Sequence, residues 1–184
     1  NFAQNCPDID LRILATERLS SFYSDGIDLA IRQGSPPASA SLDATLLFKQ
    51  EVIAVAAPRN GKNKIVLFEP AALAKQPKIH DAHDLWPSYL AHLDLRDQSS
   101  RGLRLSQTAL AVDAAIAGQG VALVSYFLVA NDLEAGRLIQ VGDAWDPGDS
   151  DFYLIAERSS TGNAKVCKVI EWFKYQSGQK FSAY

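Results

Sequence analysis

The segment that most constrains the fold of this chain is residues 107–117, whose side chains are apolar almost all round a helix. Such a helix has to be buried against other elements, because it has no polar face to turn to water. The glycines at 118 and 120 end it, and the apolar run at 121–124 then predicts a buried strand. A buried helix that leads directly into a buried strand is typical of α/β proteins.

The N-terminal part of the chain predicts the same architecture. Residues 8–14 alternate polar and apolar side chains, which is the pattern of a strand. Thr16 can cap a short helix that Asp25 and Gly26 end. An apolar run at 27–31 follows. Because a helical crossover leads to this run, we expect it to form a buried strand parallel to the first.

The rest of the chain continues the alternation of strands and helices. We expect strands at 51–57, 78–80, 103–105, 138–141 and 152–156, and helices at 70–76, 84–93, 126–135 and 164–175. Ser106 is the expected cap of the buried helix. The polar, turn-rich stretch at 59–64 is the expected first crossing between two lobes, and the strand from Phe152 carries the chain back.

Composition limits the classes of function. The 184 residues are 47% hydrophobic, which is enough to bury a core, and the formal net charge of -3 provides no basic surface for nucleic acid. No run approaches the roughly 18 apolar residues of a membrane span, and the first residues lack the pattern of a secretory signal. Cys6 and Cys167 lie far apart, which favours two thiols in a reducing compartment over a disulfide framework.

The sequence contains no signature of a catalytic or cofactor site. It has neither a GxSxG nucleophile elbow nor a GxxxxGK[ST] phosphate loop. Residues 80–84, His-Asp-Ala-His-Asp, could offer ligands to a metal, but no distant third ligand group is identifiable, so a turn with polar caps is favoured. We therefore expect no enzyme activity, no cofactor and no metal.

Polar residues at strand and helix ends are the candidates for ligand binding. Arg32 follows a buried strand, and open α/β sheets bind ligands at the carboxyl edge of their strands, although this arginine could instead pair with a nearby aspartate. Ser106 and Thr108 begin the buried helix, where backbone N–H groups and hydroxyls suit a carboxylate or phosphate, and ordinary capping explains Ser106 equally well. Thr16 lies at the expected start of a helix in the first lobe, as Ser106 and Thr108 do in the second. These groups favour an anionic ligand.

Three segments resemble the effector domains of LysR-type transcriptional regulators. Residues 24–34 are similar to the family's DLAIRxG segment, residues 111–124 are similar to its helix-to-strand segment AAxAGxGVAL, and residues 132–138 continue the second match. The order and spacing of the segments agree with the family. The resemblance is strongest toward the branch that contains activators of glycine cleavage and of β-lactamase, and it extends over essentially all 184 residues.

The resemblance implies a fold of the type II periplasmic-binding-protein kind, in which two hinge-crossing strands join two α/β lobes and a small effector binds between them. The first lobe would comprise 1–57 and 158–184, and the second 58–157. Carried over by position, the effector-binding residues are Thr16, Arg32, Ser106, Thr108, Tyr126 and Tyr153. The family also places a first strand and a winged helix-turn-helix DNA-binding domain ahead of this region, and it implies a cytoplasmic homodimer or homotetramer.

Three functions are consistent with these observations. A sensor would bind its effector and control transcription through the attached DNA-binding domain. A stand-alone periplasmic solute-binding protein of the same fold would instead deliver a ligand to a transporter. It would need a signal peptide, whereas the sensor needs an upstream helix-turn-helix. The third function is a small enzyme, and the missing nucleophile, base and metal set count against it.

Overall fold

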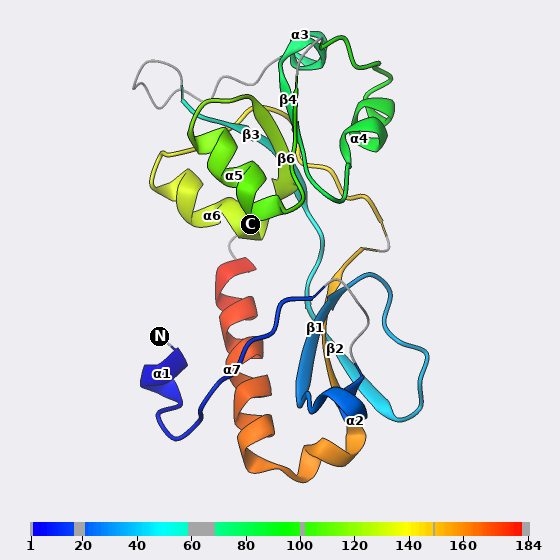
Figure 1. Cartoon of the computed structure of the whole chain (residues 1–184), viewed down its shortest axis with the longest axis vertical. Helices are drawn as coiled ribbons and strands as arrows, with labels where there is room; N and C mark the ends of the chain where they lie inside the picture. Colours follow the sequence, from blue (N-terminus) through cyan, green and yellow to red (C-terminus); the bar gives the residue numbers. More distant parts are fainter. Residues whose placement is uncertain (1, 17–20, 59–68, 100–101, 149, 182–184) are drawn as a thin grey trace. The chain divides into compact units, whose positions relative to one another are not determined.

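The chain folds into two compact units, each with its own sheet (Figure 1). The computed structural model describes residues 2–16, 21–58, 69–99, 102–148 and 150–181. The first unit comprises Asn1–Lys49 and Gly148–Tyr184, and the second comprises Gln50–Pro147. Helices and strands are mixed in both units, so the expected α/β class is confirmed.

The units divide the chain at different residues from the boundaries expected from the sequence. Strand β3 (Val52–Ala56) falls in the expected first lobe, but it pairs with strands of the second unit. Strand β8 (Phe152–Glu157) falls in the expected second lobe, but it lies at the centre of the first unit's sheet. The physical reason is that both strands are apolar runs next to a crossing, and only their hydrogen-bond partners decide which sheet each one joins. The predicted crossing at 59–64 lies outside the described residues.

The second unit is built on a five-stranded sheet in the order β5-β4-β6-β3-β7. Strand β4 is parallel to β5 and to β6, whereas β3 is antiparallel to β6 and β7. The other strands of this sheet are β4 (Lys78–His80), β5 (Gly102–Arg104), β6 (Val121–Ser125) and β7 (Ile139–Gln140). All five correspond to strands expected from the sequence.

Helices cover both faces of this sheet because its central strands are apolar on both sides. Alternate side chains of β3 point to opposite faces, so Ile53 and Val55 pack with one pair of helices and Val52 and Ala54 with the other. The first pair is α5 (Thr108–Ile116) and α6 (Tyr126–Glu134); the second is α3 (Pro70–Lys75) and α4 (Trp86–His92). Figure 1 shows α5 and α6 together, with α4 on the other side of the strands.

The start of α5 differs from the expectation based on sequence. Its first helical residue is Thr108 and its N-cap is Gln107, whose extended backbone precedes the helix. Ser106 is therefore one residue too early to cap it, and that expectation was wrong. Burial is confirmed for one face of the helix only: Ala111, Val112 and Ala115 are all at most 8% exposed, whereas Leu110 is 46% exposed.

The first unit contains a three-stranded antiparallel sheet in the order β1-β8-β2. Strand β1 (Leu29–Gln33) was expected to run parallel to a strand at 8–14, but it pairs with β8 instead. Strand β2 (Leu42–Phe48) was not anticipated, although residues 42–46 alternate apolar and polar side chains. The long helix α7 (Ala164–Phe181) contacts β2 and follows the short 3-10 helix η2 (Arg158–Gly162).

Residues 8–14 were expected to form a strand, and this expectation was wrong. They are irregular, and Leu11, Ile13 and Leu14 are 41%, 81% and 60% exposed. An alternating pattern is not enough for a strand, because the backbone also needs a neighbouring strand to pair with. Two short helices flank this segment, α1 (Phe2–Asn5) and α2 (Phe22–Asp25).

Gly120 allows β6 to begin close against the chain that leads into β4. Its φ is +159°, and a Cβ added there would lie 2.6 Å from the backbone oxygen of Pro77. We expect Gly120→Ala to lower the free energy of unfolding by about 3 kcal/mol, since the backbone itself must move. Gly118→Ala is the matched control, because its φ is +75° but no atom of the described residues lies within 4 Å of an added Cβ. It should cost about 1 kcal/mol. Urea unfolding compares the two, and equal losses would show that the close approach to Pro77 has no cost.

Candidate functional site

The carboxyl ends of the parallel strands β4, β5 and β6 meet at one edge of the second unit's sheet. Because β3 is antiparallel to β6, the start of β3 lies at this edge too. Open α/β sheets bind ligands at the carboxyl ends of their strands, next to the helices that begin there. We call this the carboxyl edge, and we use the name for five polar residues there: Gln50, Asp81, Thr108, Ser125 and Tyr126.

Thr108 and Asp81 are in direct contact at the carboxyl edge. Asp81 follows the last residue of β4, and Thr108 is the first residue of α5. The Thr108 hydroxyl donates a hydrogen bond of 2.5 Å to Asp81 Oδ2. The other oxygen, Oδ1, accepts from the backbone N–H groups of His83 and Asp84 at 3.0 and 3.2 Å. The Asp81 carboxylate is thus held by three donors at the start of α5.

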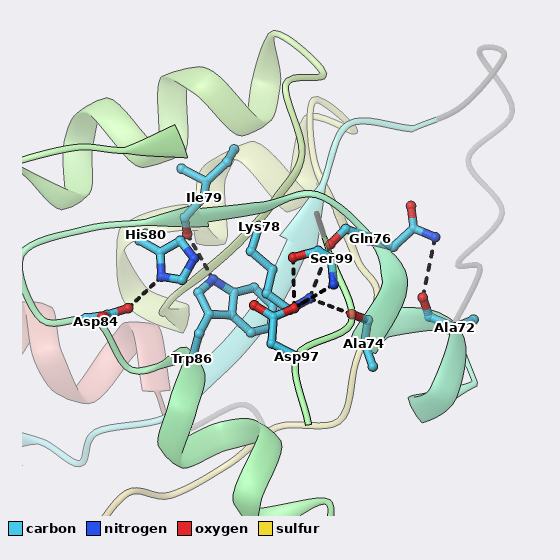
Figure 2. Close-up of polar contacts among 10 residues, drawn as sticks. All are labelled: Ala72, Ala74, Gln76, Lys78, Ile79, His80, Asp84, Trp86, Asp97 and Ser99. Atoms are coloured by element: carbon cyan, nitrogen blue, oxygen red, sulfur yellow. Dashed lines mark hydrogen bonds and ion pairs between the residues drawn. The ribbon is translucent and has the colours of Figure 1, made fainter. Parts of the chain in front are cut away.

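The turn at 81–84 is anchored by a second polar group. His80 Nδ1 lies 2.5 Å from Asp84 Oδ1, and Arg104 Nη1 lies 3.5 Å from Asp84 Oδ2 (Figure 2 shows the His80 contact). The hydrogen bond to His80 lowers the pKa of Asp84 below its ordinary value of 3.8, and the Arg104 charge adds to this effect. The expected turn with polar caps is therefore confirmed. Within the described ranges, no three His, Cys, Asp or Glu side chains come together as a metal group.

At the other strands of the carboxyl edge, a buried polar pair joins β3 to β6. Gln50 is only 2% exposed, and its Oε1 accepts a hydrogen bond of 3.1 Å from the Ser125 hydroxyl. Tyr126, the next residue, begins α6, and its backbone N–H donates to the Glu51 oxygen at 2.8 Å. The Tyr126 ring is half-buried and packs against the apolar cluster under α5 and α6. These contacts fix the start of α6 to the sheet.

In the first unit, the structure makes Arg32 and Tyr153 neighbours. They are cross-strand partners in the register of β1 and β8. Directly opposite residues of antiparallel strands project on the same side of the sheet, so a guanidinium and a phenol lie together on one face. Both side chains are half-buried. Arg32 lies inside β1, whereas the sequence had indicated a position just after the strand.

Thr16 and Ser106 are placed differently from the other four expected residues. Thr16 is exposed in the irregular segment, and the helix it was expected to cap begins instead at Phe22 with Ser21 as N-cap. The residues between them, 17–20, lie outside the described part. Ser106 is exposed between β5 and α5. Neither takes part in the contacts described above.

Sequence reasoning missed three residues of the carboxyl edge: Asp81, Gln50 and Ser125. Asp81 was considered only as a metal ligand or a turn residue, yet it directly follows a strand that ends beside the start of a helix. That position was the available signal. Gln50 carried no signal, because its burial depends on pairing between β3 and β6.

The sequence matches a known family over nearly its full length. Residues 1–177 match the family described as LysR substrate binding domain. The glycine cleavage system transcriptional activator of Escherichia coli K12 is 30% identical over 176 residues, which cover 94% of this chain and 57% of the relative. The homolog of this activator from Haemophilus influenzae is 28% identical over 174 residues, which cover 93% of this chain and 57% of the relative. The chain therefore spans less than two thirds of the length of these relatives.

Solved structures of effector domains share the fold. The effector domain of the transcriptional regulator AmpR of Pseudomonas aeruginosa superposes with a TM-score of 0.74 at 20% identity, covering 97% of this chain and 86% of that chain. The AmpR effector binding domain from Citrobacter freundii superposes with a TM-score of 0.74 at 20% identity, covering 97% of this chain and 88% of that chain. The expected type II periplasmic-binding-like fold is thereby confirmed.

Proposed function

This chain belongs to the LysR substrate-binding domain family, and from that premise we propose that it binds a small-molecule effector and passes that signal to the rest of a transcriptional regulator. The observation that carries the proposal is the family match over residues 1–177. The relatives it matches are transcriptional regulators and not enzymes, in agreement with the expected absence of catalytic activity.

Two sets of polar side chains support effector binding. In the first unit, Arg32 and Tyr153 present a cation and a phenol on one face of the sheet. In the second, Thr108 and Tyr126 begin helices at the carboxyl edge, where α/β sheets bind ligands. We propose all four as effector-binding residues. We also propose Thr16, which is exposed in the irregular segment, and Ser106, which is exposed two residues before α5 begins.

The remaining parts of the proposal concern the whole regulator. We propose that it binds DNA through a winged helix-turn-helix domain in another part of the regulator, that it acts in the cytoplasm, and that it assembles as a homodimer or homotetramer. The described residues contain no helix with the length and apolar character that a bilayer crossing requires. A stand-alone periplasmic solute-binding protein is not favoured, because the relatives with matching sequences are transcriptional regulators.

The proposal predicts saturable binding of a small polar compound. A suitable set of probes is the twenty common amino acids, their C-terminal amides, their N-acetyl derivatives, and the dicarboxylates malonate, succinate and glutarate. At least one should raise the Tm of this 184-residue protein, and the rise should grow with the logarithm of the probe concentration above its Kd, because a ligand that binds only the folded state stabilises it. Calorimetry then measures its Kd. If no probe of any class binds saturably, the proposed function is contradicted.

Arg32→Gln is expected to weaken the best-binding probe about tenfold to a hundredfold, because a charged hydrogen bond is lost. Arg158→Gln is the matched control in the same unit, since Arg158 pairs with Asp43 at 2.8 Å on the exposed surface. The control should leave the Kd unchanged. Equal losses of affinity in both variants, or none in Arg32→Gln, would remove Arg32 from the site.

A further inference from the structure

The hydrogen bond between Thr108 and Asp81 determines what Thr108 can offer to a bound molecule. A hydroxyl has one hydrogen to donate and lone pairs with which to accept. In this structure the Thr108 hydrogen is directed to Asp81 Oδ2. What Thr108 still has for an incoming group is therefore its lone pairs, and it can act only as an acceptor.

Asp81 is positioned firmly enough to impose this direction. Its Oδ1 is occupied by the N–H groups of His83 and Asp84, so the carboxylate cannot rotate away without losing two backbone hydrogen bonds. A carboxylate has no hydrogen to give back to Thr108. The donor and acceptor roles between Asp81 and Thr108 are therefore not interchangeable.

The local charge leads to the same conclusion. The start of a helix carries about half a positive elementary charge, which would ordinarily attract an anion. At α5 the Asp81 carboxylate already lies there and more than offsets it. The Arg104 guanidinium is directed at Asp84 rather than at Asp81. An anionic group that approached Thr108 would meet an acceptor next to a like charge.

We propose that the effector group bound at Thr108 is a hydrogen-bond donor with positive charge, an ammonium group, and that Asp81 is the positioning residue that selects it. This inference rests on the proposed function, since it specifies the chemistry of one of the proposed effector-binding residues. It replaces, at this residue, the anionic group that the sequence favoured.

Asp81→Asn tests the inference because it reverses the hydrogen bond while leaving the turn in place. The amide oxygen of the substituted side chain can still accept from the N–H groups of His83 and Asp84, while its NH2 group donates to Thr108. The Thr108 hydrogen then becomes available to a ligand oxygen. For amino acids that bind, the wild-type protein should prefer the C-terminal amide, which keeps the ammonium, over the N-acetyl derivative by at least about tenfold. Asp81→Asn should reverse that order.

Further variants distinguish selection of an ammonium group by Asp81 from a general effect of a substitution on the turn or on the local charge. Asp84→Asn removes a neighbouring charge of the same sign but leaves the contact between Thr108 and Asp81 intact, so it should keep the wild-type preference. Asparagine also tolerates the positive φ of 42° at this position. Thr108→Val should weaken the amides about tenfold, and Thr108→Ser should restore them.

The outcomes distinguish failure of this inference from failure of the proposed function. If N-acetyl derivatives or dicarboxylates bind the wild-type protein better than the amides do, and Asp81→Asn does not alter the order, the inference is overturned and the effector-binding function stands. The same holds if Asp84→Asn reverses the preference as strongly as Asp81→Asn does. If no probe binds saturably to any variant, both are overturned.

Discussion

Trp86→Ala is expected to lower the free energy of unfolding of the second unit by about 4 kcal/mol, because it removes a large aromatic side chain from the core. Trp86 is 2% exposed at the start of α4, where its ring packs edge-on against Tyr89 with 5.9 Å between centroids. Its Nε1 donates to the Ile79 oxygen of β4 at 2.9 Å (Figure 2). The substitution therefore also removes that buried hydrogen bond.

Urea unfolding followed by circular dichroism measures this loss. Trp86→Phe should cost about 2 kcal/mol, because it keeps most of the packing but not the hydrogen bond to Ile79. Leu128→Ala, at a position 45% exposed on α6, should change the stability by less than about 1 kcal/mol. Losses of equal size in Trp86→Ala and Leu128→Ala would contradict the assignment of Trp86 to the core.

Asp97→Asn is expected to lower the free energy of unfolding by about 2 kcal/mol near pH 7, because it takes away the carboxylate that the buried Lys78 ammonium contacts. Lys78 is 0% exposed, and its Nζ lies 2.8 Å from Asp97 Oδ1, 2.8 Å from the Ala74 oxygen and 3.2 Å from the Gln76 oxygen. The ammonium also lies 5.5 Å from the centre of the Trp86 ring (Figure 2). We place the cost below that of a fully buried pair because the Asp97 side chain is 41% exposed.

The loss should depend on pH in a defined direction. Burial alone would raise the pKa of Asp97, but hydrogen bonds from Lys78 and Ser99 hold it below the ordinary value of 3.8. A carboxyl whose pKa is lowered by folding stabilises the protein above that ordinary value, and the contribution is lost as the pH falls through the lowered pKa. The stabilities of wild type and Asp97→Asn should therefore converge in acid below the ordinary value. Asp113→Asn, on the exposed side of α5, is the matched control and should change the stability near pH 7 by less than about 1 kcal/mol.

Most elements of the second unit could be predicted from the sequence because their side chains carry a local pattern. The apolar runs at 52–56 and 121–125 are strands in the structure, and the apolar helix before the second run is α5. The burial of both strands follows from composition alone, since strands that are apolar on both faces have no other stable place. The family could be identified for the same reason, because its segments are contiguous in the chain.

The candidate site was only partly predictable. Arg32, Thr108, Tyr126 and Tyr153 follow from the resemblance, but the pairing of Arg32 with Tyr153 joins residues far apart in the chain. The contact of Thr108 with Asp81 likewise spans 27 positions. The sequence favoured an anion at Thr108 because a helix start attracts one in isolation, and it could not show that a carboxylate of the same chain already occupies that place.

The sequence by itself therefore determined the α/β class, the family, the buried strands and helices of the second unit, and the residue types available for an effector. Only the tertiary structure decided which sheet β3 and β8 join, that residues 8–14 are irregular, and that the Thr108 hydrogen is directed at Asp81. The physical reason is that periodicity and composition act over a few neighbouring residues, whereas strand pairing and hydrogen-bond direction depend on partners distant in the chain.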